Sequence, residues 1–295
     1  MPEPSPGRRL RDAWSSRPIM IPGTFNALTA RMAERLGFEA VYLSGGALSA
    51  GWAGLPDIGL LGATEFAEAA TVLASATKLP VLCDADTGFG ATVNVERTVA
   101  LYERAGVAGL HIEDQEMPKR CGHLSGKSLV TVEAMAAKLR AAVSSRSDPD
   151  FVVVARTDAR AVEGFDAAVA RARAYVEAGA DMIFPEALES LDEFAAFARE
   201  VNAPLIANMT EFGRSPLLAF DDLAAAGYRA VLYPLTAFRS AMRAAGETLA
   251  ALRDAGTQRD ELGRMLTRAE LYDLIGYDDW DARDRAYFGD KDPRS

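Results

Sequence analysis

The sequence predicts an α/β protein, and within that class a (β/α)8 barrel of the TIM type. Short apolar runs alternate with longer amphipathic segments eight times, and 295 residues suit a barrel that typically needs roughly 250. Polar side chains capable of chemistry follow the C-terminal ends of these runs, which is where barrels of this type build their sites. A doubly wound open sheet is the structural alternative.

The predicted strands are brief, rich in β-branched or bulky residues, and continuous rather than alternating in polarity. Such runs are typical of parallel strands that are buried on both faces. We predict strands at Ile19–Ile21, Ala40–Leu43, Val81–Asp84, Gly109–Glu113, Phe151–Arg156, Met182–Phe184, Leu205–Asn208 and Ala230–Tyr233.

The predicted helices are rich in Ala, Glu, Arg and Leu, with apolar residues at helical spacing. Gly37, Gly106 and Gly227 follow three of them, and glycine can adopt the left-handed conformation that closes a helix. We predict helices at Asn26–Leu36, Glu65–Ala76, Val95–Ala105, Thr131–Val143, Asp166–Ala178, Leu191–Arg199, Leu217–Ala226 and Ala237–Leu252.

Composition and charge restrict the class of protein. With 49% hydrophobic residues and no long linker, residues 1–295 are expected to form a single domain. Residues 1–17 are rich in Pro, Arg and Ser and predict an N-terminal arm without a secretory signal. Residues 256–295 predict a C-terminal helical extension that ends in a charged tail.

The net charge of −10 argues against nucleic acid or an anionic membrane as a partner, but a local cluster of cations can still bind an acidic small molecule. No stretch approaches the ~18 consecutive apolar residues of a membrane helix. Two cysteines are too few for a disulfide framework, which favours a reducing, cytoplasmic location.

A candidate reactive thiol lies in the run Lys119-Arg120-Cys121-Gly122-His123. Neighbouring cations stabilise a thiolate, so Cys121 is predicted to give up a proton more readily than a free thiol. His123 is expected to orient the thiol or to bind an anion. Cys83 and His111 lie inside predicted strands and are interpreted as core residues. A zinc site would need more Cys or His ligands than this segment offers.

Carboxylates at two neighbouring strand ends predict a metal site. Asp84 and Asp86 are expected to point to one side of an extended backbone, with Glu113 and Asp114 one strand away. Mg²⁺ prefers oxygen ligands and keeps several waters, so this set suits it, with Mn²⁺ as a substitute. The alternative is a helix cap or an ion pair at a strand end.

Other strand ends carry candidate ligands for substrate oxygens. Ser44-Gly45-Gly46 offers backbone N–H groups and a hydroxyl, although a plain turn is an alternative, and Asp57 is similarly ambiguous. Arginines can clamp carboxylates through paired hydrogen bonds. The candidates are Arg156, Arg239 and Arg268, of which Arg156 follows a strand directly.

These motifs together resemble the isocitrate lyase and phosphoenolpyruvate mutase superfamily, and within it the 2-methylisocitrate lyases. The matching segments are Tyr42 to Gly46, Asp84 to Gly90, Ile112 to Gln115, Lys119 to His123, Ala155 to Asp158, Phe184 to Ala187, Asn208 to Gly213, Tyr233 to Leu235, and Thr267-Arg268. Isocitrate lyases proper are longer and tend to carry Lys-Lys before Cys-Gly-His, where this chain has Lys119-Arg120.

The resemblance implies a Mg²⁺-dependent enzyme that cleaves 2-methylisocitrate to pyruvate and succinate in propionate catabolism through the methylcitrate cycle. It further implies a homotetramer in which a C-terminal helix is swapped against a neighbouring subunit. Cys121 would protonate the carbanion, with Lys119 and His123 beside it, and Tyr42, Glu113 or a metal-linked water would be the base. Substrate would contact the following residues besides those named above: Arg120, Gly122, Glu186, Asn208 and Thr210, with Phe184 and Pro234 making room for the methyl group.

Rival activities in the same superfamily are isocitrate lyase, an oxaloacetate-type decarboxylase, a dimethylmalate-type lyase and a phosphonomutase. A decarboxylase or mutase needs no thiol acid, so the Lys119–His123 segment disfavours both. A rival from another class is a catalytically silent barrel that binds carboxylates.

Overall fold

The computed structural model describes residues 3–120, 122 and 126–288. The chain divides into two compact units, residues 1–238 and 239–295, and each is described by itself. The predicted division into one domain with an arm and an extension stays a prediction. In the described residues, no helix is long and apolar enough to span a membrane.

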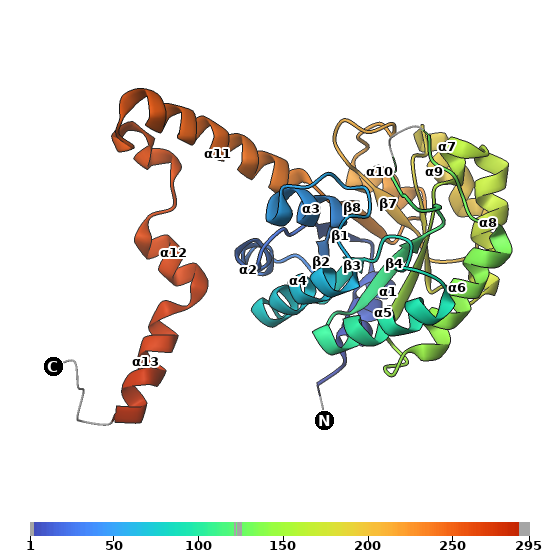
Figure 1. Ribbon diagram of the computed structural model, residues 1–295, viewed down its shortest axis with the longest axis horizontal. Helices are drawn as coiled ribbons and strands as arrows, with labels where there is room; N and C mark the ends of the chain where they lie inside the picture. The colour runs from blue at the N-terminus through green and yellow to red at the C-terminus, as the bar shows by residue number, and fades with distance from the viewer. Residues whose placement is uncertain (1–2, 121, 123–125, 289–295) are drawn as a thin grey trace. The chain divides into compact units, whose positions relative to one another are not determined.

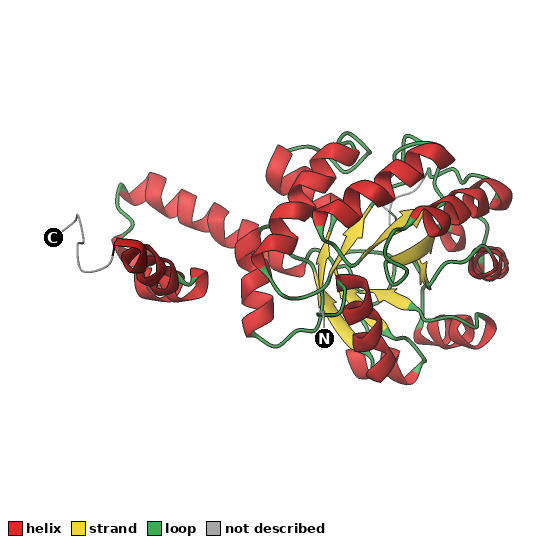
Figure 2. Ribbon diagram, turned by 90° about the horizontal axis from the view of Figure 1, so that it is seen from below, coloured by secondary structure: helices red, strands yellow, loops and turns green. Residues whose placement is uncertain are grey.

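The first unit is built on eight parallel strands, as predicted. Five strands pair in the order β2-β3-β4-β5-β6 and three in the order β1-β8-β7. Single bridges, Gly23 with Tyr42 and Ile183 with Leu205, join the two sheets, so the strands close into a barrel surrounded by helices (Figure 2). The strands are β1 Ile19–Pro22, β2 Val41–Leu43, β3 Val81–Asp84, β4 Gly109–Glu113, β5 Val152–Thr157, β6 Met182–Pro185, β7 Ile206–Asn208 and β8 Ala230–Tyr233.

All eight predicted helices are present. Except for α11, which lies mostly in the second unit, they surround the strands (Figure 1). Their bounds are α2 Ala27–Arg35, α4 Ala63–Ala76, α5 Thr92–Ala105, α6 Val132–Ser145, α8 Phe165–Glu177, α9 Leu191–Glu200, α10 Phe220–Ala225 and α11 Thr236–Ala255. The first unit also contains three helices that the sequence pattern did not predict, namely α1 Pro6–Ser16, α3 Gly45–Ala53 and α7 Ala159–Val162.

Helix α1 is the largest departure from the predicted N-terminal arm. Ser5 caps it, because its side chain accepts a hydrogen bond from the Arg8 N–H, and Pro6 begins it. Leu10 and Trp14, four residues apart, are buried with the residues that point into the barrel. Arg11 Nε donates to the Asp150 carbonyl at 2.8 Å, just before β5 begins. Helix α1 therefore packs at the N-terminal end of the barrel, opposite the predicted site.

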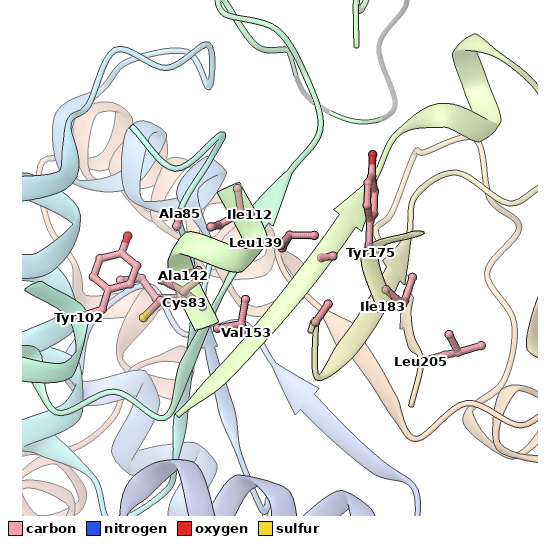
Figure 3. Close-up of a cluster of buried hydrophobic side chains, with 14 of the residues drawn as sticks. Cys83, Ala85, Tyr102, Ile112, Leu139, Ala142, Val153, Tyr175, Ile183 and Leu205 are labelled. Atoms are coloured by element: carbon pink, nitrogen blue, oxygen red, sulfur yellow. The ribbon is translucent and has the colours of Figure 1, made fainter. Parts of the chain in front are cut away.

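Side chains on the two faces of the strands form two separate cores. Alternate residues such as Ile21, Val154 and Leu232 fill the barrel interior. The intervening residues, among them Val153 and Ile183, pack against the surrounding helices (Figure 3). Burial on both faces explains why the strands read as continuous apolar runs.

The second unit contains most of α11, a 3₁₀ helix at Arg259–Arg264, and helices α12 Arg268–Ile275 and α13 Tyr277–Phe288. Thr267 caps α12 in a capping box with Glu270. Helix α13 takes up the first ten residues of the predicted charged tail, which begins at Asp279. The described part of residues 256–295 is therefore largely helical, as far as Phe288.

Candidate active site

The C-terminal ends of the strands bring many of the predicted polar residues to one cavity of about 60 Å³, although Asp86 and Glu186 are not among its lining residues. This volume is well below the roughly 300–1,000 Å³ of pockets that hold small ligands. The lining residues are Tyr42, Ser44, Gly46, Asp57, Asp84, Glu113, Lys119, Arg120, Gly122, Arg156, Phe184, Asn208, Thr210, Leu232, Pro234 and Leu235.

Asp84 and Asp86 converge through a turn and not through strand alternation, so the predicted extended backbone is wrong. Strand β3 ends at Asp84, and Asp86 has a φ of 45°, in the left-handed region. The Asp86 N–H donates to Asp84 Oδ1 at 2.9 Å. The Gly45 N–H donates to Asp84 Oδ2 at 3.0 Å, so this N–H serves the carboxylate instead of the cavity.

The two aspartates differ in their affinity for protons. Burial opposes ionisation of Asp84, but the neighbouring His111 ring, the Lys119 ammonium and the Asp86 N–H lower its pKa to about 2. Burial and repulsion by Asp84 raise the pKa of Asp86 to about 7, against the attraction of Lys119. Asp84 is therefore the firmly ionised member of the pair.

The Lys119 side chain lies among the carboxylates of the site. Its ammonium forms ion pairs with Asp86 Oδ1, at 2.7 Å, and with Asp57. Burial alone would lower the pKa of Lys119, but Glu113, Asp84, Asp86 and Asp57 together raise it. So many carboxylates around one ammonium create a negative potential that suits a cation of higher charge.

Arg156 is the cation on the other side of the cavity. Its guanidinium bonds Asp158 at 3.1 and 3.2 Å and lies 3.3 Å from Glu186 and 3.4 Å from Glu113. It also stacks over the Phe184 ring, with Cζ 5.2 Å from the ring centroid. Arg156 is thus fixed in one orientation with its donors directed toward the site.

Glu186, directly after β6, and Asn208, the last residue of β7, extend the polar cluster around Arg156. Asn208 Nδ2 donates to both carboxylate oxygens of Glu186 at 3.2 Å. Asn208 Oδ1 is buried and has no hydrogen-bond partner in the part of the chain that the structure describes. Thr210 lines the cavity beside them, and Pro234 and Phe184 add apolar surface.

Tyr42 and Glu113, two of the candidate bases, are both buried. Burial raises the pKa of Tyr42 and, separately, that of Glu113, well above their ordinary values. Tyr42 Oη lies 2.7 Å from His111 Nε2, which is 3.4 Å from Asp84 Oδ1. Burial lowers the pKa of His111 to about 4, so the ring is neutral at neutral pH.

The Ser44-Gly45-Gly46 segment forms the N-terminus of helix α3 and is therefore not a plain turn. Its role in binding substrate oxygens stays a prediction. Ser44 is the N-cap, and its hydroxyl accepts the Ala47 N–H at 3.4 Å. A helix N-terminus carries partial positive charge and favours anionic oxygens. Ser44 and Gly46 line the cavity, with Asp57 close to Gly46.

The thiol segment reaches the site at Gly122. A Cβ at Gly122 would lie 2.2 Å from Arg156 Nη2 and 2.6 Å from Glu186 Cγ, so only glycine fits against these side chains. Arg120 lines the cavity mouth and is exposed. The predicted acid, Cys121, and its neighbour His123 lie outside the described residues.

Two predicted clamps belong to the second unit. Arg239 is half-buried on α11, and Arg268 is exposed at the start of α12. Because that unit is described by itself, their contribution to the site stays a prediction.

Sequence reasoning did not assign a role to three groups behind the cavity. His111, interpreted as a core histidine, contacts both Tyr42 and Asp84. Lys127 Nζ bonds Asp158 Oδ1 at 2.7 Å, and both side chains are buried. Asp158 belongs to the Ala155–Asp158 motif, but two of its partners, Lys127 and Asp114, are distant in sequence, so only the fold reveals them.

The described residues fit a divalent cation that is partly coordinated by water. They contain no cluster of three or more His, Cys, Asp or Glu side chains arranged to hold a metal. Mg²⁺, however, is commonly bound through one or two carboxylates plus waters and substrate. Asp84 and Asp86 supply such a pair, and Glu113 Oε1 is a buried oxygen without a hydrogen-bond partner among the described residues.

The fold and this site define a class: barrel enzymes with carboxylates suited to a metal ion, and with cations and a helix N-terminus suited to anionic substrates, at the C-terminal face of the strands. Residues 10–253 match the family model of phosphoenolpyruvate phosphomutase. The chain belongs to this family, which confirms the superfamily that the motifs indicated.

Relatives within the family point to one branch. The chain is 52% identical to the 2-methylisocitrate lyase of Aeropyrum pernix over 280 residues, covering 95% of this chain and 90% of that protein. It is 49% identical to the 2-methylisocitrate lyase of Escherichia coli over 275 residues, covering 92% and 93%.

Solved structures of the family share the architecture. A complex of oxaloacetate acetylhydrolase with 3,3-difluorooxalacetate matches with a TM-score of 0.91 at 34% identity, covering 98% of this chain and 99% of that one. A 2,3-dimethylmalate lyase matches with a TM-score of 0.90 at 34% identity, covering 98% and 97%. A phosphonopyruvate hydrolase bound to oxalate and Mg²⁺ matches with a TM-score of 0.88 at 34% identity, covering 97% and 100%.

Proposed function

We propose that this protein is a Mg²⁺-dependent carbon–carbon lyase that cleaves 2-methylisocitrate into pyruvate and succinate. The observation that carries the proposal is the approach of Gly122, next to the thiol, to the fixed guanidinium of Arg156. Identities near 50% with 2-methylisocitrate lyases over more than nine-tenths of the chain support the same substrate. The reaction belongs to propionate catabolism through the methylcitrate cycle.

Asp84 and Asp86 would hold Mg²⁺, or Mn²⁺ in its place, directly or through water. The bound ion would polarise the substrate oxygens that gain negative charge as the bond breaks. Lys119 would have to yield part of its contact with Asp86 to the incoming cation. Its remaining partner, Asp57, would keep the ammonium close to the substrate.

The remaining residues would bind the substrate's carboxylates and hydroxyl. Arg156, Asn208 and Thr210 would bind the succinate half, with Glu186 holding the first two in place. The start of α3, Ser44 to Gly46, would bind the pyruvate end, where the helix N-terminus favours anionic oxygen. Losing one such preset donor typically costs on the order of 10²–10³-fold in rate.

Protons balance across the cleavage. A base takes the proton of the substrate's tertiary hydroxyl, the adjacent carbon–carbon bond breaks, and pyruvate leaves as the ketone. The bonding electrons stay on the succinate carbon, which Cys121 then protonates, so the thiol ends as a thiolate. Burial raises the pKa of both Tyr42 and Glu113, and the base remains one of Tyr42, Glu113 and a metal-linked water.

The methyl group that distinguishes 2-methylisocitrate from isocitrate would lie against apolar surface. Phe184 and Pro234 were predicted to make room for it, and Leu232 and Leu235 line the same cavity. One methylene in such a pocket discriminates by about 1–3 kcal/mol. The enzyme would therefore cleave isocitrate more slowly than 2-methylisocitrate and would not exclude it completely.

We further propose a cytoplasmic homotetramer in which the C-terminal extension packs on a neighbouring subunit. The second unit exposes large apolar side chains in this single chain, among them Leu249, Leu252, Leu262 and Trp280. Such surface is typical of an interaction site. Multi-angle light scattering of the full chain should give four times the chain mass, and a monomer would contradict this proposal.

A side-by-side turnover assay tests the proposed function. Purified protein with Mg²⁺ is given 2-methylisocitrate or isocitrate, and pyruvate and glyoxylate release are followed by coupled dehydrogenases. We expect kcat/KM for 2-methylisocitrate to exceed that for isocitrate by at least tenfold. Preferred cleavage of isocitrate would replace the substrate, and no turnover of either acid would favour a silent carboxylate-binding barrel.

A further inference from the structure

We infer that Lys127 is a positioning residue that anchors the thiol-bearing turn to the arginine of the active site. The inference rests on the proposed function, in which Cys121 is the acid. Lys127 lies outside the Lys119–His123 motif, and its side chain is only 1% exposed. A lysine this deeply buried requires partners for its charge.

The Lys127 ammonium has two hydrogen-bond partners, which belong to different parts of the site. Its ammonium donates to the Gly122 carbonyl and to Asp158 Oδ1, the latter at 2.7 Å. Gly122 follows Cys121 directly in the chain, so the first bond holds the backbone one residue from the thiol. The second bond ends on the last residue before α7, behind β5.

Asp158 joins this anchor to Arg156. Its two oxygens bond the guanidinium at 3.1 and 3.2 Å, and the side chain is fully buried. The Asp158 carboxylate thus bonds both Lys127, which holds Gly122, and Arg156, which is proposed to bind substrate. Asp158 is fixed in turn, because its N–H donates to Asp114 Oδ1 at 2.9 Å.

Gly122 is held from the opposite side as well. The space for a Cβ at this position is filled by Arg156 Nη2 and Glu186 Cγ. Lys127 therefore holds the Gly122 peptide next to Arg156. Lys127 and Arg156 are also linked to each other, because both bond Asp158. These contacts fix the Gly122 backbone beside the guanidinium of Arg156, and a displacement of about 1 Å in an active site can cost on the order of 100-fold in rate.

The chain offers a matched control at the other end of β5. Arg146 Nη1 bonds the Phe151 carbonyl at 2.9 Å and Asp181 Oδ2 at 2.8 Å, so it too joins a carbonyl to a carboxylate. Asp181 keeps a second cation, Arg11, at 2.8 Å, as Asp158 keeps Arg156. Loss of either bridging cation leaves the carboxylate paired, but only Lys127 reaches the site.

The test compares Lys127→Met with Arg146→Met in the full-length protein, with wild-type turnover of 2-methylisocitrate measured first. We expect Lys127→Met to lower kcat about 100-fold with KM within threefold, and Arg146→Met to keep kcat within twofold. A Lys127→Met enzyme with kcat within threefold of wild type, or an equal loss in Arg146→Met, would overturn the inference. If Lys127→Met does not fold, Lys127→Arg decides, because its longer side chain must shift Gly122 and lower kcat at least tenfold, whereas unchanged kcat overturns the inference.

A second readout does not depend on the substrate. The chain has two cysteines, and Cys83 is fully buried, so alkylation by iodoacetamide reports on Cys121. At pH 9.5, above the ordinary thiol pKa of about 8.5, loss of the anchor should speed labelling at least threefold in Lys127→Met and leave Arg146→Met unchanged. Equal labelling rates in all three proteins would overturn the inference. If Lys127→Met labels at least threefold faster than wild type but the wild type does not cleave 2-methylisocitrate, only the proposed function is overturned.

Discussion

Replacing Gly122 by alanine tests the packing of the thiol segment against the substrate-binding cation. The added methyl group would lie 2.2 Å from Arg156 Nη2, whereas ordinary contact begins at 3.4 Å, so about 1.2 Å of movement is required. Arg156 resists this movement because Asp158 and Glu186 hold it at 3.1–3.3 Å. The turn or the guanidinium must therefore leave its position.

A displacement of this size predicts a loss of on the order of 100-fold in kcat/KM for 2-methylisocitrate, equivalent to about 2.7 kcal/mol. The assay is steady-state pyruvate release, with thermal unfolding of Gly122→Ala measured alongside to show that the barrel is intact. Activity within threefold of wild type in a folded variant would refute the reasoning, because it would mean that the segment tolerates a side chain where the structure leaves no space.

Three further perturbations probe the metal site, the core and an ion pair. Asp86→Ala should abolish Mg²⁺ binding measured by isothermal titration calorimetry, and unchanged heats would exclude this carboxylate as a ligand. Phe194→Ala, at a ring 1% exposed and packed edge-on to Tyr228, should lower the free energy of unfolding by about 3–5 kcal/mol in urea titrations, and a loss below 1 kcal/mol would contradict the packing. The hydrogen bond from Arg171 lowers the pKa of Glu163. The ionised form therefore stabilises the folded state above the unfolded pKa of about 4.3, and this is lost as pH falls through the lower folded value. Wild type should exceed Glu163→Gln in stability at pH 7, and this difference should shrink as the pH falls below about 4.3 and vanish below the folded pKa; a difference that does not shrink in acid would count against this assignment.

The barrel strands could be predicted from the sequence because their burial leaves a simple pattern. Each predicted strand agrees with the structure to within one residue at either end. Residues such as Val153 and Val154 face opposite cores, so both are apolar and the run is continuous. The helices between strands were predictable for the related reason that each buries one face only.

Helices α1 and α3 could not be predicted because tertiary contacts stabilise them. Helix α1 buries Gly7, Leu10 and Trp14 among polar neighbours, and its two large apolar side chains are too few to be recognised as an apolar stripe. Helix α3 begins with two glycines, which are poor helix formers. Asp84 stabilises its first turn by accepting the Gly45 N–H, a contact that exists only after folding.

The site residues were predictable as a set but not in their pairings. Asp84, Asp86, Glu113 and Arg156 were recognisable from their places at strand ends. The turn at Asp86 replaces the expected extended backbone, because its left-handed φ is a local choice that alternation cannot reveal. Lys127 bonds an aspartate 31 residues away, so a lysine in a loop reads as solvated until the strands are assembled.

Substitution of the thiol by a hydroxyl gives the most direct test of the proposed chemistry. Cys121→Ser should bind Mg²⁺ and 2-methylisocitrate with wild-type affinity by calorimetry, because the proposed ligands of both are unchanged. Its turnover should fall by about 10²–10⁴-fold, since a serine hydroxyl is a far weaker acid at the carbanion. Turnover within threefold of wild type would show that another group delivers the proton.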